Sequence, residues 1–325
     1  MVRMYLNPGR CPLLFNRLII TLIAVSYMAY GNAFAQCLSS ANPVGGSANL
    51  LVLEKNTVRV IGFYRFNYGD QYYEGSKRSG FDLIRSENYN YAGSIVGYGL
   101  AERTTLEAEL GYFINKTQVY NIDPQYVLTG SGLSNAILSV KYGLLKNNEK
   151  RFFISSGIGA KIPFSTEPQS RDGVELPVEV QPTIGAFGMV LQGFIVKEKP
   201  VTGTRYFITG RMEMNSRNRR DYRLGTSVTT SFFISKHLMM PWLKGDWTAI
   251  LQLRNETREA DKTSTGVRES TGSTIFYLSP QLNNFINEKW NLSLLADIPV
   301  YRHFNGIQLT TKFGITLTLA REFSL

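Results

Sequence analysis

The stretch IQLTTKFGITLTLAREFSL, residues 307–325, ends the chain and decides its fold class. Its odd positions are mostly apolar from Ile307 to Leu319, whereas the even positions up to Thr318 are polar or Gly. Successive side chains of a strand point to opposite faces, so the stretch predicts a strand with one apolar and one polar face. It exceeds the usual strand of about 5–6 residues. It is long enough to cross a membrane, which takes roughly 9–11 tilted residues.

The same alternation recurs along most of the chain. It predicts about twelve strands, at residues 57–71, 88–100, 104–118, 135–145, 151–163, 180–196, 204–214, 222–234, 246–258, 271–285, 290–301 and 307–325. Long polar connections alternate with shorter ones, as in barrels with long outside loops and short periplasmic turns. The 19 Phe and 18 Tyr favour strands and membrane-interface girdles. The sequence therefore predicts an all-β protein with a single antiparallel transmembrane β-barrel, and a soluble sandwich is the alternative.

Residues 1–35 are predicted to be a cleaved signal peptide. Arg10 and Arg17 precede an apolar run at 18–29, and Ala33-Phe34-Ala35 has the small-x-small pattern of a cleavage site. The run is shorter than the roughly 20 residues of a transmembrane helix. An exported chain with membrane strands points to the outer membrane of a Gram-negative cell.

Two further divisions follow from this pattern. We expect residues 36–56 to form a periplasmic lead-in, with a plug or a pairing segment as its candidate roles, and residues 57–325 to form the barrel. Cys37 follows the predicted cleavage point, and Gln36 occupies the position where a lipid-attachment motif needs a small residue, so a lipid anchor is the weaker alternative. The C-terminal strand, with Phe323 near its tip, resembles the signal that the barrel-assembly machinery reads.

The alternation also directs charged side chains into the lumen. An Arg or Lys on the lipid face costs about 2–4 kcal/mol at the midplane of the bilayer. The lumen-lining candidates are eight cations and four acids: Arg59, Arg65, Lys141, Lys161, Arg205, Arg211, Arg223, Arg254, Glu107, Glu109, Glu213 and Asp297. Two interpretations stay open, a polar conduit that favours anionic solutes and a packed electrostatic network that fills the lumen. Bulky residues expected inside favour constriction: Phe63, Phe187, Phe207, Ile250, Tyr277 and Tyr301.

Arg217, Arg219 and Arg220 fall in a predicted outside loop. Their guanidinium groups suit bidentate contacts with lipid phosphates, and a solvated charged loop is the alternative. The net charge is +10. Behind a secretory signal and among aromatic strands, this charge favours a cationic lumen or anionic lipid headgroups rather than nucleic acid.

Catalytic residues, a metal site and cofactors are not expected. The two histidines, His237 and His303, fall on opposite sides of the membrane in the predicted topology, and spacing identifies no Ser partner for His303. An outer-membrane lipid hydrolase is therefore the least favoured alternative. Glu107 and Glu109 share a strand face among cations, which predicts ion pairs rather than acid–base catalysis.

Several short segments resemble the outer-membrane barrel family first associated with phenol meta-pathway degradation, the MetA-like transporters. They are GYGLAER at 97–103, GLSN at 132–135 followed by VKY at 140–142, GIGAKIP at 157–163, and IPVYR at 298–302. The resemblance implies a membrane barrel that passes small molecules, hydrophobic ones among them, and it identifies no binding residue. We expect a channel for small hydrophobic or anionic solutes, with a closed structural or surface-interaction barrel as the alternative.

Overall fold

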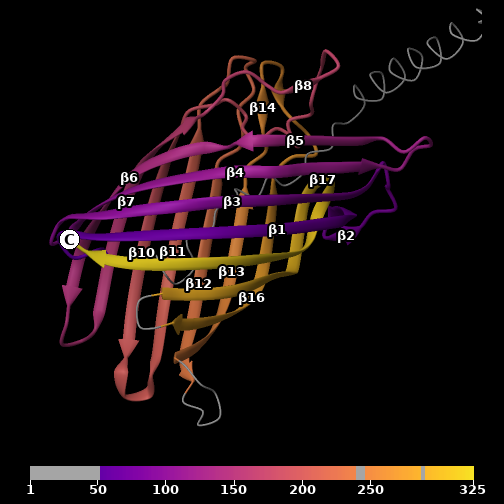
Figure 1. Ribbon diagram of the computed structural model, residues 1–325. Coiled ribbons are helices and arrows are strands. Elements are labelled where there is room, and N and C mark those ends of the chain that lie inside the picture. The colour runs from indigo at the N-terminus through magenta and orange to yellow at the C-terminus, as the bar shows by residue number, and fades with distance from the viewer. Residues whose placement is uncertain (1–51, 239–245, 287–289) are drawn as a thin grey trace, which may run out of the picture.

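The computed structural model describes residues 52–238, 246–286 and 290–325. Its main sheet closes on itself, because β17 pairs with β16 on one side and with β1 on the other (Figure 1). All pairs in the ring are antiparallel, which confirms the predicted all-β barrel. In chain order the ring contains β1 (Thr57–Gly75), β3 (Ile84–Ala101), β4 (Thr104–Tyr120), β6 (Asn135–Asn147), β7 (Phe152–Pro163), β10 (Gly188–Lys199), β11 (Thr204–Asn215), β12 (Ser227–Leu238), β13 (Asp246–Arg258), β16 (Ser273–Ile286) and β17 (Trp290–Ser324).

β17 crosses the wall twice. Its residues up to Phe304 pair with β16, and those from Phe304 onward pair with β1. An antiparallel ring closes only with an even number of passes, and the described part of the chain contributes eleven elements to it, so β17 must reverse direction. Gly306, whose φ is 67°, lies at the reversal. The wall therefore has twelve passes, in agreement with the sequence.

The outer face of the barrel is apolar and the inner face is largely polar. In β17 the odd positions from Phe313 to Leu319 are exposed and the even positions Thr316 and Thr318 are buried, as predicted. The pattern ends above Phe313, because the register between β1 and β17 shifts at Gly69. Leu309, expected on the outer face, is buried as a result.

Short connections gather at one end of the barrel. They span residues 102–103, 148–151 and 200–203, the last of which contains a 3-10 turn, η2 (Pro200–Thr202). The described ends of the chain meet at the same end, where the N–H of Leu325 donates to the carbonyl of Asn56 at 2.9 Å. Outer-membrane barrels direct such short turns to the periplasm, so we name this the periplasmic end. Among the described residues, no helix is long and apolar enough to cross a membrane.

The longer connections carry short strands at the opposite, outer end. They are β2 (Lys77–Arg78), β8 (Ser170–Arg171), β9 (Val174–Glu175), β14 (Lys262–Thr263) and β15 (Gly266–Val267). β5 (Val127–Leu133) precedes β6 and pairs with the outer half of β4. β5 lies between the strands predicted at 104–118 and 135–145, so it is an additional strand that the alternation does not predict.

Residues 176–187, here called the inner loop, fold into the outer mouth of the barrel. The strand predicted at 180–196 is wrong over this part, since β10 begins only at Gly188. Pro182 has no N–H for a sheet ladder, and Gly185 has a φ of 70°. Val180 packs against Leu128 of β5 instead.

Candidate functional site: a charged lumen closed by the inner loop

The interior has two apolar walls that face each other. One comprises buried side chains of β10 to β13, namely Phe194, Val196, Phe207, Phe233 and Ile250. The other comprises buried side chains of β1, β3, β4 and β17, namely Ile61, Phe63, Tyr91, Ile95, Phe113 and Ala320. The two walls form separate clusters, and charged side chains occupy the space between them. Phe187 and Tyr301, predicted to point inward, are exposed instead, because Phe187 lies in the inner loop and the register shifts beside Tyr301.

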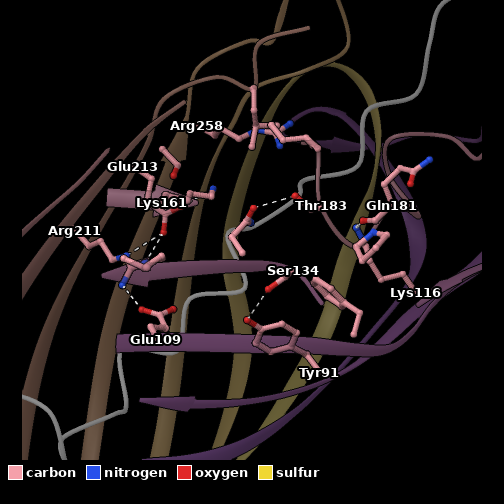
Figure 2. Close-up of a pocket in the computed structure, with 17 residues that line it drawn as sticks. Tyr91, Glu109, Lys116, Ser134, Lys161, Gln181, Thr183, Arg211, Glu213 and Arg258 are labelled. Atoms are coloured by element: carbon pink, nitrogen blue, oxygen red, sulfur yellow. Dashed lines mark hydrogen bonds and ion pairs between the residues drawn. The ribbon is translucent and has the colours of Figure 1, made fainter. Parts of the chain in front are cut away.

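Arg211 on β11 joins the two walls. Its Nη1 lies 3.0 Å from Oε2 of Glu109 on β4, and its Nη2 lies 2.9 Å from Oε1 of Glu213 (Figure 2). Lys161 on β7 is 3.2 Å from the other oxygen of Glu213. β4 and β11 are separated by three strands of the ring, so the Arg211–Glu109 contact spans the lumen.

Asp297 is the centre of a second cluster. Its Oδ2 accepts a hydrogen bond from Arg65 at 3.1 Å and forms an ion pair with Arg254 at 3.0 Å, while Ser279 donates to Oδ1 at 2.5 Å. Arg254 also reaches Glu256 at 3.0 Å. These residues come from β1, β13, β16 and β17, so the cluster ties together strands on both sides of the closing seam.

Lys141 and Glu107 form a third contact, 2.8 Å long, between neighbouring strands β6 and β4. The Lys141 ammonium also lies 4.5 Å from the ring centroid of Phe194, a cation–π contact with the apolar wall of β10 to β13. Glu107 and Glu109 thus both hold cationic partners, which confirms the prediction of ion pairs.

The structure places the predicted lumen residues in three environments. Arg59 and Arg205 lie at the periplasmic rim, where they pair with Glu322 and Glu198. The prediction that Arg223 lines the lumen is wrong, because β12 begins only at Ser227. The backbone of Arg223 instead bonds to that of Lys262 in the outer loops. The remaining nine are buried: Arg65, Glu107, Glu109, Lys141, Lys161, Arg211, Glu213, Arg254 and Asp297.

The charge of the buried interior is nearly balanced. Among the described residues the buried cations are Arg65, Lys116, Lys141, Lys161, Arg211, Arg254 and Arg258, and the buried acids are Glu107, Glu109, Glu179, Glu213, Asp261 and Asp297. Seven cations against six acids is a smaller excess than the eight to four expected from the strand registers. The excess is smaller by three charges, and two acids of the outer loops, Glu179 and Asp261, account for two of them.

Lys116 is buried in the lumen, although the alternation of the sequence does not predict an inward side chain at this position. Ile114, two positions earlier, is exposed, so both even positions of β4 were expected on the lipid face. The pairing of β3 with β4 skips Ile114, with Tyr91 opposite Phe113 and Asn90 opposite Asn115. Such a bulge moves later side chains to the other face, and no simple period marks it.

Side chains of the wall hold the inner loop in place above a cavity of about 90 Å³. Lys116 Nζ donates to the Gln181 carbonyl at 2.9 Å, and Thr183 Oγ1 donates to Asn135 Oδ1 at 2.9 Å (Figure 2). Arg211 and Lys161 line the cavity below. The inner loop thus separates the charged lumen from the outer mouth.

Glu179 of the inner loop faces Arg268 of the connection after β13, with Nη2 and Oε1 3.4 Å apart. Burial raises the pKa of the Glu179 carboxyl above its ordinary value, and the nearby cations Arg268 and Lys116 oppose this shift only in part. Glu179 is a buried residue that the strand pattern does not predict, because it directly precedes the strand expected at 180–196.

The outside arginines are engaged with acidic side chains. Arg219 contacts Glu167 and Arg220 contacts Glu175, and Arg217 lies 3.8 Å from Asp221. These loop contacts leave each guanidinium beside a carboxylate. Binding of lipid phosphates by these residues stays a prediction, in which the phosphate competes with those acids.

The two histidines lie at opposite ends of the barrel. Nδ1 of His237 is 3.0 Å from Asp246 at the periplasmic rim, and Nδ1 of His303 is 3.2 Å from Ser76 Oγ at the outer end. Among the described residues, no carboxylate forms a salt bridge with His303 to orient its ring for nucleophilic catalysis. The described residues also contain no group of three His, Cys, Asp or Glu side chains that could hold a metal ion.

The barrel is similar to that of the COG4313 outer membrane channel from Pseudomonas putida F1. The TM-score is 0.66 at 14% identity, over 86% of this chain and 98% of that chain. The KdgM porin matches with a TM-score of 0.40 at 9% identity, over 81% of this chain and 99% of that one. No family model matches the sequence, and no curated protein matches it. The fold is that of an outer-membrane β-barrel, and the apolar outer face places it in the outer membrane of a Gram-negative cell.

Proposed function

We propose that this barrel is a channel for small polar solutes, closed by the inner loop in the conformation described above. The proposal rests on one observation: the interior of the barrel is charged, and the inner loop above it is held to the wall by side-chain hydrogen bonds. Lys116 and Thr183 contribute single hydrogen bonds to that closure. Contacts of this size, worth about 0.5–3 kcal/mol each, can be exchanged for water or solute.

The chemistry of the lumen supports a polar solute over a hydrophobic one. The apolar walls are separate clusters, and Arg211 and Lys141 lie between them. A buried ion pair is often no more stable than apolar residues of the same volume. A barrel with only a structural role would therefore gain little from this network, whereas a conduit for hydrated or charged solutes requires polar walls.

The resemblance to the MetA-like transporters, together with the COG4313 likeness in fold, supports the channel class. Membership of that family is part of the proposal. The hydrophobic solutes that the resemblance implies fit this interior poorly, because such a solute would displace water from the charged side chains and offer them no hydrogen bond in return. The excess of one buried cation predicts only a modest preference for anions.

A crosslink between the inner loop and the wall tests the proposal. Thr183→Cys and Asn135→Cys, in a Cys37→Ser background, would join side chains whose polar atoms now lie 2.9 Å apart. The two cysteines are joined either by oxidation to a disulfide or by a short bismaleimide. Either crosslink should suppress conductance in planar bilayers. Reduction of the disulfide should restore the conductance of the oxidised sample. The single Thr183→Cys variant is the control and should conduct throughout. Absence of conductance in every sample, including the unmodified protein, would instead support the closed structural barrel.

Selectivity gives a second test. Arg59 and Arg65 share the inner face of β1, and replacing both with Gln should shift the reversal potential under a salt gradient toward cations. The shift should shrink at high ionic strength, because screening acts over about 10 Å at 0.1 M salt. An open pore whose selectivity ignores both substitutions would exclude this part of the lumen from the solute path.

A further inference from the structure

Three lysines lie together on the outer face of the barrel, close to its periplasmic end. Lys197 and Lys199 are on β10 and Lys236 is on β12, with β11 between these strands (Figure 1). The intervening residue Glu198 points to the inner face, where it pairs with Arg205 at 3.2 Å. The strand alternation thus sorts the charges, with the lysines outside and the acid inside.

The registers show where the hydrocarbon zone ends on these three strands. Ile195, Ile208 and Phe232 stand side by side in one exposed row. Two residues nearer the periplasm the row is Lys197, Tyr206 and Ile234, and after two more it is Lys199, Thr204 and Lys236. The first row is wholly apolar, the second contains one tyrosine and one lysine, and the third has two lysines and a threonine. This is the order expected across the hydrocarbon–headgroup boundary.

Within the described residues none of these lysines forms a salt bridge, although many other cations of the barrel do. Lys197 Nζ contacts the carbonyl of Lys150, Lys236 Nζ contacts the carbonyl of Thr202, and Lys199 Nζ lies 5.5 Å from the Tyr206 ring centroid. The connection at 239–245 contains no Asp or Glu in its sequence. An ammonium has three donors, so each lysine keeps hydrogen-bonding capacity for an anionic ligand.

From this geometry we infer that Lys197, Lys199 and Lys236 form a binding site for an anionic glycerophospholipid of the periplasmic leaflet. The phosphate would accept from the lysines, and the acyl chains would lie on the row of Ile195, Ile208 and Phe232. A zwitterionic lipid fits less well, because its own ammonium would face the cluster. The site is on the outside of the wall, so it is independent of whether the lumen conducts.

Lipid binding by the purified full-length mature protein tests the inference. The probes are phosphatidylglycerol and phosphatidylethanolamine, added separately in neutral detergent and counted as bound adducts by native mass spectrometry. The wild-type protein should retain phosphatidylglycerol in preference to phosphatidylethanolamine. The triple variant Lys197→Gln/Lys199→Gln/Lys236→Gln should bind phosphatidylglycerol roughly tenfold or more weakly, since each lysine near a headgroup contributes severalfold. Its phosphatidylethanolamine binding should not change.

Two matched variants make the result specific. Lys77→Gln/Arg78→Gln/Arg85→Gln removes the same charge at the outer end and should leave phosphatidylglycerol binding intact, and replacing the three lysines with Arg should preserve it. Equal retention of phosphatidylglycerol by the wild-type and the Gln triple variant would overturn the inference. Binding of polyglutamate without preference for phosphatidylglycerol would overturn it too, in favour of an acidic periplasmic protein partner.

Discussion

The guanidinium of Arg211 on β11 lies 3.0 Å from the carboxylate of Glu109 on β4, across the lumen of a twelve-pass barrel. Three strands separate β4 from β11 along the wall, so the contact directly links strands that lie a third of the way around the ring from each other. Both side chains are buried. The ion pair therefore both restrains the shape of the barrel and obstructs its interior.

Replacing Arg211 with Gln should both widen the conducting path and lower the stability of the barrel. Removing one partner of a buried ion pair leaves an uncompensated charge and costs about 3–5 kcal/mol. We expect a lower urea midpoint in detergent and a larger single-channel conductance than the wild type. Lys312→Gln is the control, because its exposed contact with Asp70 should contribute no more than about 1 kcal/mol.

Lys141 and Glu107 offer a clean measurement of a buried pair. Lys141→Met should destabilise the barrel by about 3–5 kcal/mol, because Glu107 would stay buried without its 2.8 Å partner. Lys141→Met/Glu107→Gln should recover most of that loss. A double-mutant cycle on urea unfolding reports the coupling, and additive effects of the two changes would show that the pair is energetically independent.

Glu179 should make the conductance pH-dependent. Burial in the closed inner loop raises its pKa above the ordinary value of 4.5, whereas displacement of the loop into water would return the pKa toward that value. The closed state then binds the proton more tightly, so acidification stabilises closure. Conductance should fall between neutral pH and about pH 4.5. Glu179→Gln should abolish this component, and a rise in conductance with acid would contradict the assignment.

The C-terminal residues should be required for insertion. Phe323 pairs with Val58, and its ring stacks on Arg321 at 4.4 Å, while Leu325 bonds to Asn56. Deleting 323–325 removes pairing groups from the seam, where unpaired backbone N–H and C=O groups are costly in lipid. The yield of heat-modifiable folded protein should drop on gel electrophoresis. A deletion of residues 122–124, in the outer loop between β4 and β5, is the control for loss of three residues.

The mature chain should begin at Gln36. The predicted signal peptide at 1–35, Cys37 and the lead-in up to residue 51 lie outside the described residues. The last part of the predicted lead-in, from Val52 onward, is described and lies against the inner wall, where the N–H of Leu53 donates to Oγ1 of Thr105 at 2.8 Å. Intact-mass measurement of outer-membrane fractions checks the cleavage point, and a lipidated Cys37 would replace this prediction.

The sequence by itself determined the barrel, its twelve passes and most of its inward charges. Alternation with period two is a local property, so the faces of Arg65, Lys141 and Arg254 follow from their positions in regular strands. The pairing of Glu107 and Glu109 with cations followed as well, because an isolated charge in a lumen is costly to bury.

Only the tertiary structure decided which charges meet and what closes the lumen. Arg211 contacts Glu109 because the sheet closes into a ring, and no local sequence pattern predicts which strands then face each other. Lys116 turns inward because of a one-residue bulge at Ile114. The inner loop is held inward by the hydrogen bonds of Lys116 and Thr183. Bulges and loop paths depend on partners far away in the chain, and these long-range pairings are what the period of the sequence leaves open.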